Sequence, residues 1–333
     1  MRFYGRLQKS IDEVNQTIKI NEGFEQFQNF NIAKNLTEST IKHYQMCFDI
    51  FAEFYDVAQP CYSLTQDTIF AYIAYLKVKR NINEITLNTY LRSIRVLFYY
   101  FMEHGYTQPF QISLMKTTKQ IKHSYTDYEL DILLKKPQIS KATFCEYRNW
   151  VLVNYLLATA NREATVSNLK IGDVDFDNDV IHLRKTKNRR EQIIPLSRSL
   201  GKVLKEYLRY REGGTDDYLF CSVTGERLTE NALKLAVNKY NKKRGVMKTS
   251  VHLFRHTFAK NWIKNGGDPF RLQKILGHSS MDMVKEYVEM FCEDLKEDFD
   301  NFNPLEKFHK NSASREHKVN APKNVRKFKA PHL

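Results

Sequence analysis

Residues 251–291 read VHLFRHTFAKNWIKNGGDPFRLQKILGHSSMDMVKEYVEMF, and this stretch carries the densest set of informative residues in the chain. Thr249 or Ser250, just before it, can cap a helix whose first turn bears His252 and Arg255. Free backbone N–H groups and the helix dipole make such a first turn a favourable place for an anion. The segment HLFRH therefore predicts a helix start that binds a negatively charged group.

The second half of the stretch predicts a turn followed by another helix. Gly277 is suited to end a helix in the left-handed conformation, which places His278 in the turn. Ser279 or Ser280 can then cap the helix that carries Tyr287, nine residues after His278. A tyrosine on its own short helix can be moved into or out of a site.

Upstream, two further basic residues stand at the ends of predicted elements. Arg162 lies in ATANRE, directly after an apolar helix expected at residues 145–160. Lys187 lies in the charged turn of a hairpin whose strands are expected near residues 180–184 and 192–196. A strand near residues 173–176 and an extended piece at residues 218–221 complete a small sheet. The fold class is therefore mainly α with a small β-sheet.

These residue types suit the cleavage of a phosphodiester. The guanidinium groups of Arg162 and Arg255 offer fixed donors for the charge that grows on the nonbridging oxygens. Tyr287 can attack the phosphorus, although an ordinary pKa near 10 means that it needs a cationic surrounding or a nearby base. Such an attack keeps the bond energy in a phosphotyrosine, so the reaction needs no cofactor and no metal.

The remaining groups can handle protons. Lys187 can protonate the leaving 5′ oxygen as a general acid. His252 and His278 can hydrogen-bond a nonbridging oxygen or assist proton transfer at Tyr287. Taken singly, each residue is more often structural, and Tyr287 is one of 19 tyrosines. Their order and local contexts together favour the catalytic interpretation.

The N-terminal part reads as all-helical. One helix begins near Asn83, and one of its faces carries Asn88, Arg92 and Arg95, which can meet a DNA groove or simply face water. A basic segment follows, in which Lys119 and Lys122 can track a phosphate backbone. The predicted division is a leading helix and connection at 1–35, a helical DNA-binding domain at 36–105, a basic linker at 106–124, a catalytic domain at 125–311 and a basic tail at 312–333.

Composition supports a polyanionic partner. The 333 residues carry a net charge of +14 and a pI of about 9.3, which is typical of nucleic-acid-binding proteins but also of lysine-rich surfaces. The five cysteines are scattered without a Cys-x-x-Cys pair, so no zinc finger is expected. No signal peptide and no uncharged apolar run of membrane-spanning length is evident, so a cytoplasmic protein with no membrane partner is expected.

Together these motifs resemble the tyrosine recombinase family, the phage-integrase and Xer-like enzymes. Lys187 stands eight residues before Pro195, the register of the family's hairpin lysine. The resemblance implies a helical core-binding domain joined to an α+β catalytic domain. It also implies a site-specific recombinase that works through a 3′-phosphotyrosine and a Holliday junction, as a homo-tetramer on two double-stranded DNA sites.

Two positions depart from the family pattern. Ala160 stands where the family usually has glycine, and Thr165 stands where an acidic residue often follows the first arginine by three. Support for the neighbouring site is then expected from another carboxylate, such as Glu163.

Two other classes of DNA-binding protein are compatible with parts of this pattern. A type IB topoisomerase shares the phosphotyrosine chemistry, and a non-catalytic DNA clamp could share the fold. A zinc peptidase built on His252 and His256 is disfavoured, because Leu253 stands where that motif needs glutamate. The apolar residues of segment 291–308 can pack on a neighbouring protomer or on their own domain, and the sequence leaves both possibilities open.

Overall fold

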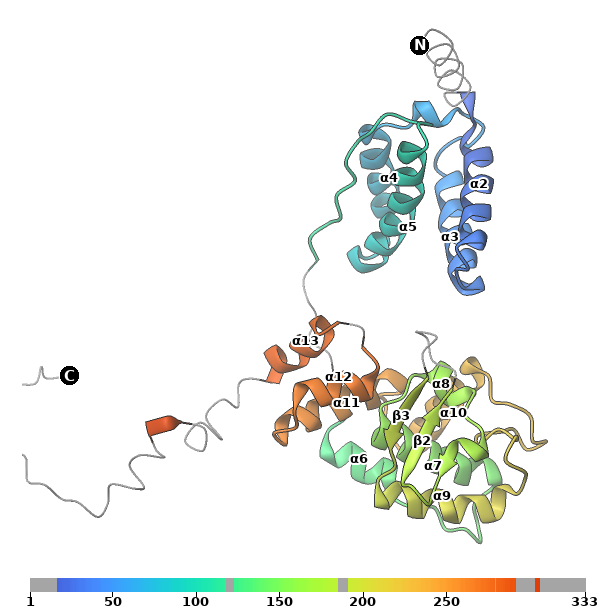
Figure 1. The fold of residues 1–333 in the computed structure, drawn as a ribbon, viewed down its shortest axis with the longest axis vertical. Helices are drawn as coiled ribbons and strands as arrows, with labels where there is room; N and C mark the ends of the chain where they lie inside the picture. The colour runs from blue at the N-terminus through green and yellow to red at the C-terminus, as the bar shows by residue number, and fades with distance from the viewer. Residues whose placement is uncertain (1–16, 118–122, 185–190, 279, 292–302, 306–333) are drawn as a thin grey trace, which may run out of the picture. The chain divides into compact units, whose positions relative to one another are not determined.

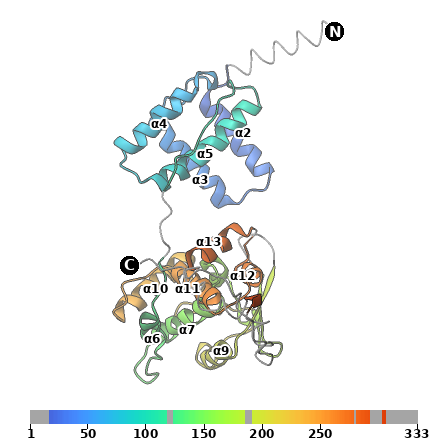
Figure 2. The same ribbon diagram turned by 90° about the vertical axis from the view of Figure 1, so that its left-hand side faces the viewer.

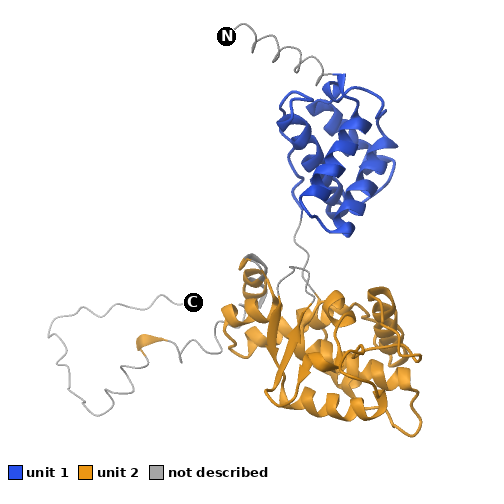
Figure 3. Ribbon diagram, turned by 45° about the vertical axis from the view of Figure 1, so that its right-hand side comes forward, with its two compact units in different colours: residues 1–120 blue, residues 121–333 orange. Residues whose placement is uncertain are grey.

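The computed structural model describes residues 17–117, 123–184, 191–278, 280–291 and 303–305 (Figure 1). The chain divides into two compact units, residues 1–120 and 121–333 (Figure 3). Within the described ranges, no helix is both long and apolar enough to cross a membrane.

The first unit is a helical bundle (Figures 1 and 2). Its helices are α2 (Ile20–Ala33), α3 (Glu38–Ala52), α4 (Gln66–Val78) and α5 (Glu84–Glu103), with a short 3-10 turn at Cys61–Ser63. Side chains of Thr37, Thr65 and Asn83 cap α3, α4 and α5 by accepting a backbone N–H of the first turn. Each cap satisfies a donor that the helix itself cannot bond, which fixes where the helix begins.

Helix α2 is an integral part of this bundle rather than a separate leading segment. Ile20, Phe24 and Phe27 are buried in the same core as residues of α3, α4 and α5. The rings of Phe24 and Phe48 stack with their centroids 3.8 Å apart. Of the leading helix and connection predicted at 1–35, residues 1–16 lie outside the described residues.

The prediction that Asn88 faces a DNA groove is wrong. Its side chain is only 3% exposed, and it donates to the Met115 carbonyl at 2.8 Å while accepting the Met115 N–H at 2.9 Å. The chain beyond α5 also buries Tyr106 and Ile112 in the bundle core. Residues that were expected to begin the linker are thus packed, and Asn88 anchors them because it satisfies both backbone groups of Met115.

Helix α7 (Phe144–Thr159) is the centre of the second unit. It is contacted by α6 (Asp127–Leu134), α9 (Arg198–Arg211), α10 (Glu230–Lys243) and α11 (Val251–Lys264). Its buried residues lie on all sides, as expected for a helix that neighbours cover all round. A capping box formed by Thr126 and Glu129 opens α6.

A small antiparallel sheet in the order β1-β2-β3 borders these helices. Its strands are β1 (Val174–Asp175), β2 (Val180–Leu183) and β3 (Gln192–Pro195), close to their predicted positions. Strand β2 pairs with β3 from Val180↔Pro195 to Leu183↔Gln192. Ile181, Leu183 and Ile194 point into the core. The hairpin predicted around Lys187 is therefore present, although residues 185–190 lie outside the described residues.

Candidate active site

Arg162 is placed by an unusual turn at the end of α7. Ala160 follows the helix with φ 54° and ψ 22°, a left-handed conformation that costs an L-residue about 1–2 kcal/mol. This turn directs the chain into the short helix α8 (Glu163–Ser167), for which Arg162 is the N-cap residue. The small side chain of Ala160, 1% exposed, fits a position where the resemblance predicts glycine.

Arg255 connects three segments that are far apart in sequence. On the first turns of α11 it donates from Nη1 to the Ala160 carbonyl at 2.8 Å. Its Nη2 donates to the Leu276 carbonyl at 2.7 Å and lies 2.6 Å from Nε2 of His278. Since a guanidinium has no acceptor, Nε2 of His278 is the acceptor in this contact.

His278 lies directly after α12 (Pro269–Leu276), where Gly277 adopts the expected left-handed C-cap at φ 60°. Strand β3 holds this turn from the other side. Gln192 Nε2 donates to the carbonyls of Lys274 and, at 3.0 Å, of Ile275. A Cβ at position 277 would lie 2.9 Å from Gln192 Oε1, so glycine also permits this close approach. Gln192 therefore ties the hairpin that carries Lys187 to the turn that carries His278.

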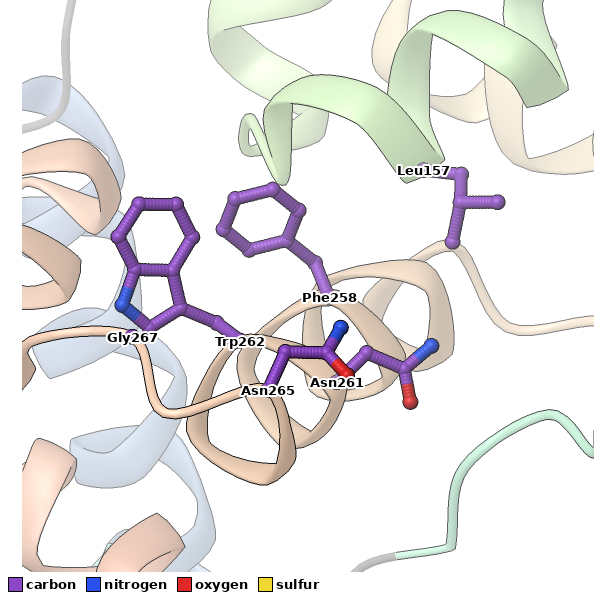
Figure 4. Close-up of a pocket in the computed structure, with 6 residues that line it drawn as sticks. All are labelled: Leu157, Phe258, Asn261, Trp262, Asn265 and Gly267. Carbon is purple, nitrogen blue, oxygen red and sulfur yellow. The ribbon is translucent and has the colours of Figure 1, made fainter. Parts of the chain in front are cut away.

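The turn from α11 to α12 is held by Trp262. Its indole Nε1 donates to the Asp268 carbonyl at 3.0 Å, and a Cβ at Gly267 would lie only 2.4 Å from that nitrogen. Trp262 and Gly267 also line a pocket of about 380 Å³ with Leu157, Phe258, Asn261 and Asn265 (Figure 4). None of the predicted catalytic residues that the structure describes lines this pocket.

The predicted cationic residues meet instead in a cleft of about 1080 Å³. Arg162, Arg255 and His278 line it together with Thr165, Gln192 and Lys274. Burial lowers the pKa of Arg162, and burial together with the charge of Arg162 lowers the pKa of Arg255 to about 10. In the described part of the chain, neither arginine forms an ion pair with a carboxylate. Glu191 also lines the cleft, but no ion pair joins it to either arginine in the described structure. Two like charges held together without an ion-paired carboxylate form a binding site for an anion.

Tyr287 lies beside this cleft on helix α13 (Asp282–Phe291). It is 1% exposed and packs with Ala160, Leu272 and Leu276. Its hydroxyl is 2.6 Å from Nδ1 of His256. Burial raises the pKa of Tyr287, and the charge of Arg255 offsets part of that rise. His256 was absent from the predicted catalytic set, although its position next to Arg255 in the HLFRH segment could have drawn attention to it.

In the structure His252 lies beside Glu163. Its side chain is 57% exposed, and Nε2 lies 3.5 Å from Oε2 of Glu163. Glu163 also pairs with Lys234 at 3.0 Å. These three residues line a neighbouring pocket of about 220 Å³. Glu163 thus lies beside His252, and both the supporting role of Glu163 and the catalytic role of His252 stay predictions.

The remaining predicted residues are only partly accounted for. Lys187, Lys119 and Lys122 lie outside the described residues. On α5, Arg92 is exposed and Arg95 is half-buried, so both stay candidates for DNA contact. Over the described positions, no group of three or more His, Cys, Asp and Glu side chains could hold a metal ion.

Two family models match most of the chain. Residues 112–293 match the model of the phage integrase family, and residues 24–108 match that of a phage integrase N-terminal SAM-like domain. A tyrosine recombinase XerC from Leptospira interrogans serovar copenhageni is 26% identical over 86% of this chain and 94% of its own length.

Solved structures share the fold. An integrase of transposon Tn1549, in complex with a circular intermediate DNA, superposes with a TM-score of 0.66 at 22% identity, over 79% of this chain and 93% of that one. A lambda integrase tetramer bound to a Holliday junction gives a TM-score of 0.64 at 15% identity, over 83% of this chain and 79% of that one.

The fold and site define an enzyme that breaks and rejoins DNA. The chain belongs to the phage integrase family, and it is a tyrosine recombinase that carries out site-specific DNA recombination.

Proposed function

We propose that the cleft holds the scissile phosphate and that Tyr287 is the nucleophile. The observation that carries this proposal is the pair of arginines, Arg162 and Arg255, that share one cleft without a carboxylate partner in the described chain. A phosphate supplies the missing negative charge. Its nonbridging oxygens gain further charge in the transition state, where fixed guanidinium donors stabilise it most.

Cleavage then exchanges one ester bond for another. The Tyr287 oxygen bonds to phosphorus as the bond from phosphorus to the 5′ oxygen breaks, leaving a 3′-phosphotyrosine and a free 5′ hydroxyl. Lys187 protonates the leaving oxygen. Because the new ester retains the bond energy, a 5′ hydroxyl from a second strand can reverse the step and join the strands in a new combination.

Strand exchange between two duplexes requires four such cleavages, and we propose that four protomers assemble on two double-stranded sites. The lambda integrase with a similar fold is a tetramer on a Holliday junction. The excess of positive charge, +14 over the chain, suits a complex with DNA. Residues 292–302 and 306–308, predicted to pack in trans or in cis, lie outside the described residues.

The nucleophile is tested with a nicked suicide substrate that traps covalent protein–DNA complexes. Tyr287→Phe is expected to abolish the complexes while leaving DNA binding nearly unchanged. Tyr207→Phe is a matched control, because it also removes a buried hydroxyl with a hydrogen bond, to the Leu219 carbonyl at 3.1 Å. Robust covalent complexes from the Tyr287 variant would refute the assignment.

A further inference from the structure

The hydroxyl of Tyr287, the proposed nucleophile, lies close to His256, a titratable residue that is not in the predicted catalytic set. Nδ1 of His256 and the hydroxyl oxygen of Tyr287 lie 2.6 Å apart, within the range of a strong hydrogen bond. The two rings come from α11 and α13, which pack against each other. The contact is thus made by two packed helices whose relative position the surrounding core determines.

The tyrosine needs such a partner. Its ring is almost fully buried among Ala160, Leu272, Leu276 and Val284, and a buried phenol resists ionisation because water no longer stabilises the phenolate. An attack on phosphorus requires the hydroxyl proton to leave. A neutral imidazole within hydrogen-bond reach is the side chain best suited to take it near neutral pH.

The two histidines of the predicted catalytic set have other contacts in the described structure. Nε2 of His278 accepts from Arg255, so that histidine is directed at the guanidinium. His252 is largely exposed and lies beside Glu163. The described structure therefore presents His256 to the tyrosine hydroxyl, in the position where a general base acts.

We propose that His256 is a further catalytic residue, the base that accepts the Tyr287 proton during cleavage and returns it during rejoining. This inference rests on the proposed role of Tyr287 as nucleophile. In the forward step the phenol proton passes to Nδ1 as the bond from oxygen to phosphorus forms, while the leaving 5′ oxygen takes a separate proton from Lys187. In the reverse step the 5′ hydroxyl attacks phosphorus and gives its proton back to Lys187, while the bond from phosphorus to the tyrosine oxygen breaks and that oxygen recovers its proton from His256.

Two substitutions separate proton transfer from simple positioning. His256→Asn keeps an acceptor, because the amide oxygen is as many bonds from Cβ as Nδ1 is, but it cannot take a proton. His256→Gln moves the amide one bond further out and loses the acceptor position. If His256 acts as a general base, both substitutions should slow single-turnover covalent complex formation by about 100-fold or more. If His256 only positions the tyrosine, the asparagine variant should cleave at a nearly normal rate, and only the glutamine variant should cleave more slowly.

Incorporation of 3,5-difluorotyrosine at position 287 completes the test. The phenol of this residue is more acidic and depends less on a base to lose its proton. The cleavage rate of both variants should therefore rise by about tenfold or more. Thermal unfolding and DNA affinity, both expected to match the unsubstituted protein, control for folding. Normal cleavage by His256→Asn, or no recovery with the fluorinated tyrosine, would overturn the inference.

The outcome also separates this inference from the proposed function. If Tyr287→Phe still forms covalent complexes, the nucleophile itself is wrongly assigned. If that variant is inactive while His256→Asn cleaves normally, the nucleophile stands and only the role of His256 fails.

Discussion

Nη2 of Arg255 and Nε2 of His278 lie 2.6 Å apart, although 23 residues separate them in the sequence. The same guanidinium donates to the carbonyls of Ala160 and Leu276. Three of its five N–H groups are engaged in this way, which leaves two for a phosphate. Arg255 thus organises the site as well as supplying positive charge to it.

Arg162→Ala and Arg255→Ala should therefore differ in stability but not in cleavage. Loss of one charge-stabilising donor typically lowers the rate by about 10²–10³, so both variants should show at least that loss in single-turnover cleavage. Arg255→Ala should also unfold at lower temperature, because two buried carbonyls lose their donor at about 1–3 kcal/mol each. Equal thermal stability of the two variants would contradict the structural role of Arg255.

Lys187→Ala should slow cleavage strongly and be rescued in part by a substrate with a 5′-phosphorothiolate. A thiolate leaves without a proton, so the general acid is no longer needed. Lys185→Ala is the matched control in the same turn. Rescue of the Lys185 variant in place of the Lys187 variant would show that the register is two residues off.

Ala160→Gly should leave the free energy of unfolding nearly unchanged. Relief of the left-handed conformation gains about 1–2 kcal/mol. Loss of a buried methyl costs about 0.8 kcal/mol, and the greater freedom of the unfolded glycine chain costs about 0.4–1 kcal/mol. These effects nearly cancel, so alanine is tolerated here. Ala160→Val, whose branched side chain is far less compatible with φ 54°, should destabilise the second unit measurably in denaturant unfolding.

Asn88→Ala and Arg92→Ala should act on different properties. The asparagine variant should destabilise the first unit by about 1–3 kcal/mol, because it leaves the partly buried backbone groups of Met115 without their partners. The exposed arginine should instead contribute to DNA affinity, and its loss should reduce the slope of log affinity against log salt by about one. An unchanged salt slope for the Arg92 variant would remove α5 from the DNA-binding surface.

Much of the architecture follows from local sequence. Gly277 ends α12 where it was expected to, and Thr37 and Thr126 cap the starts of α3 and α6, since a cap depends on residues within one turn. The strands on either side of Lys187 follow from β-rich segments flanking a charged turn. The spacing of the basic residues and Tyr287 was sufficient to predict the family.

Other features were decided only by tertiary structure. Asn88 and Met115 are 27 residues apart, and His256 and Tyr287 are 31 apart. Helical periodicity tells which residues share a face, but not which face a neighbouring helix covers. The same periodicity made Asn88 a candidate for a DNA groove, and no local pattern distinguished His256 from His252. The sequence by itself determined the elements and the chemistry they carry, and the packing of α11 against α13 decided which histidine meets the nucleophile.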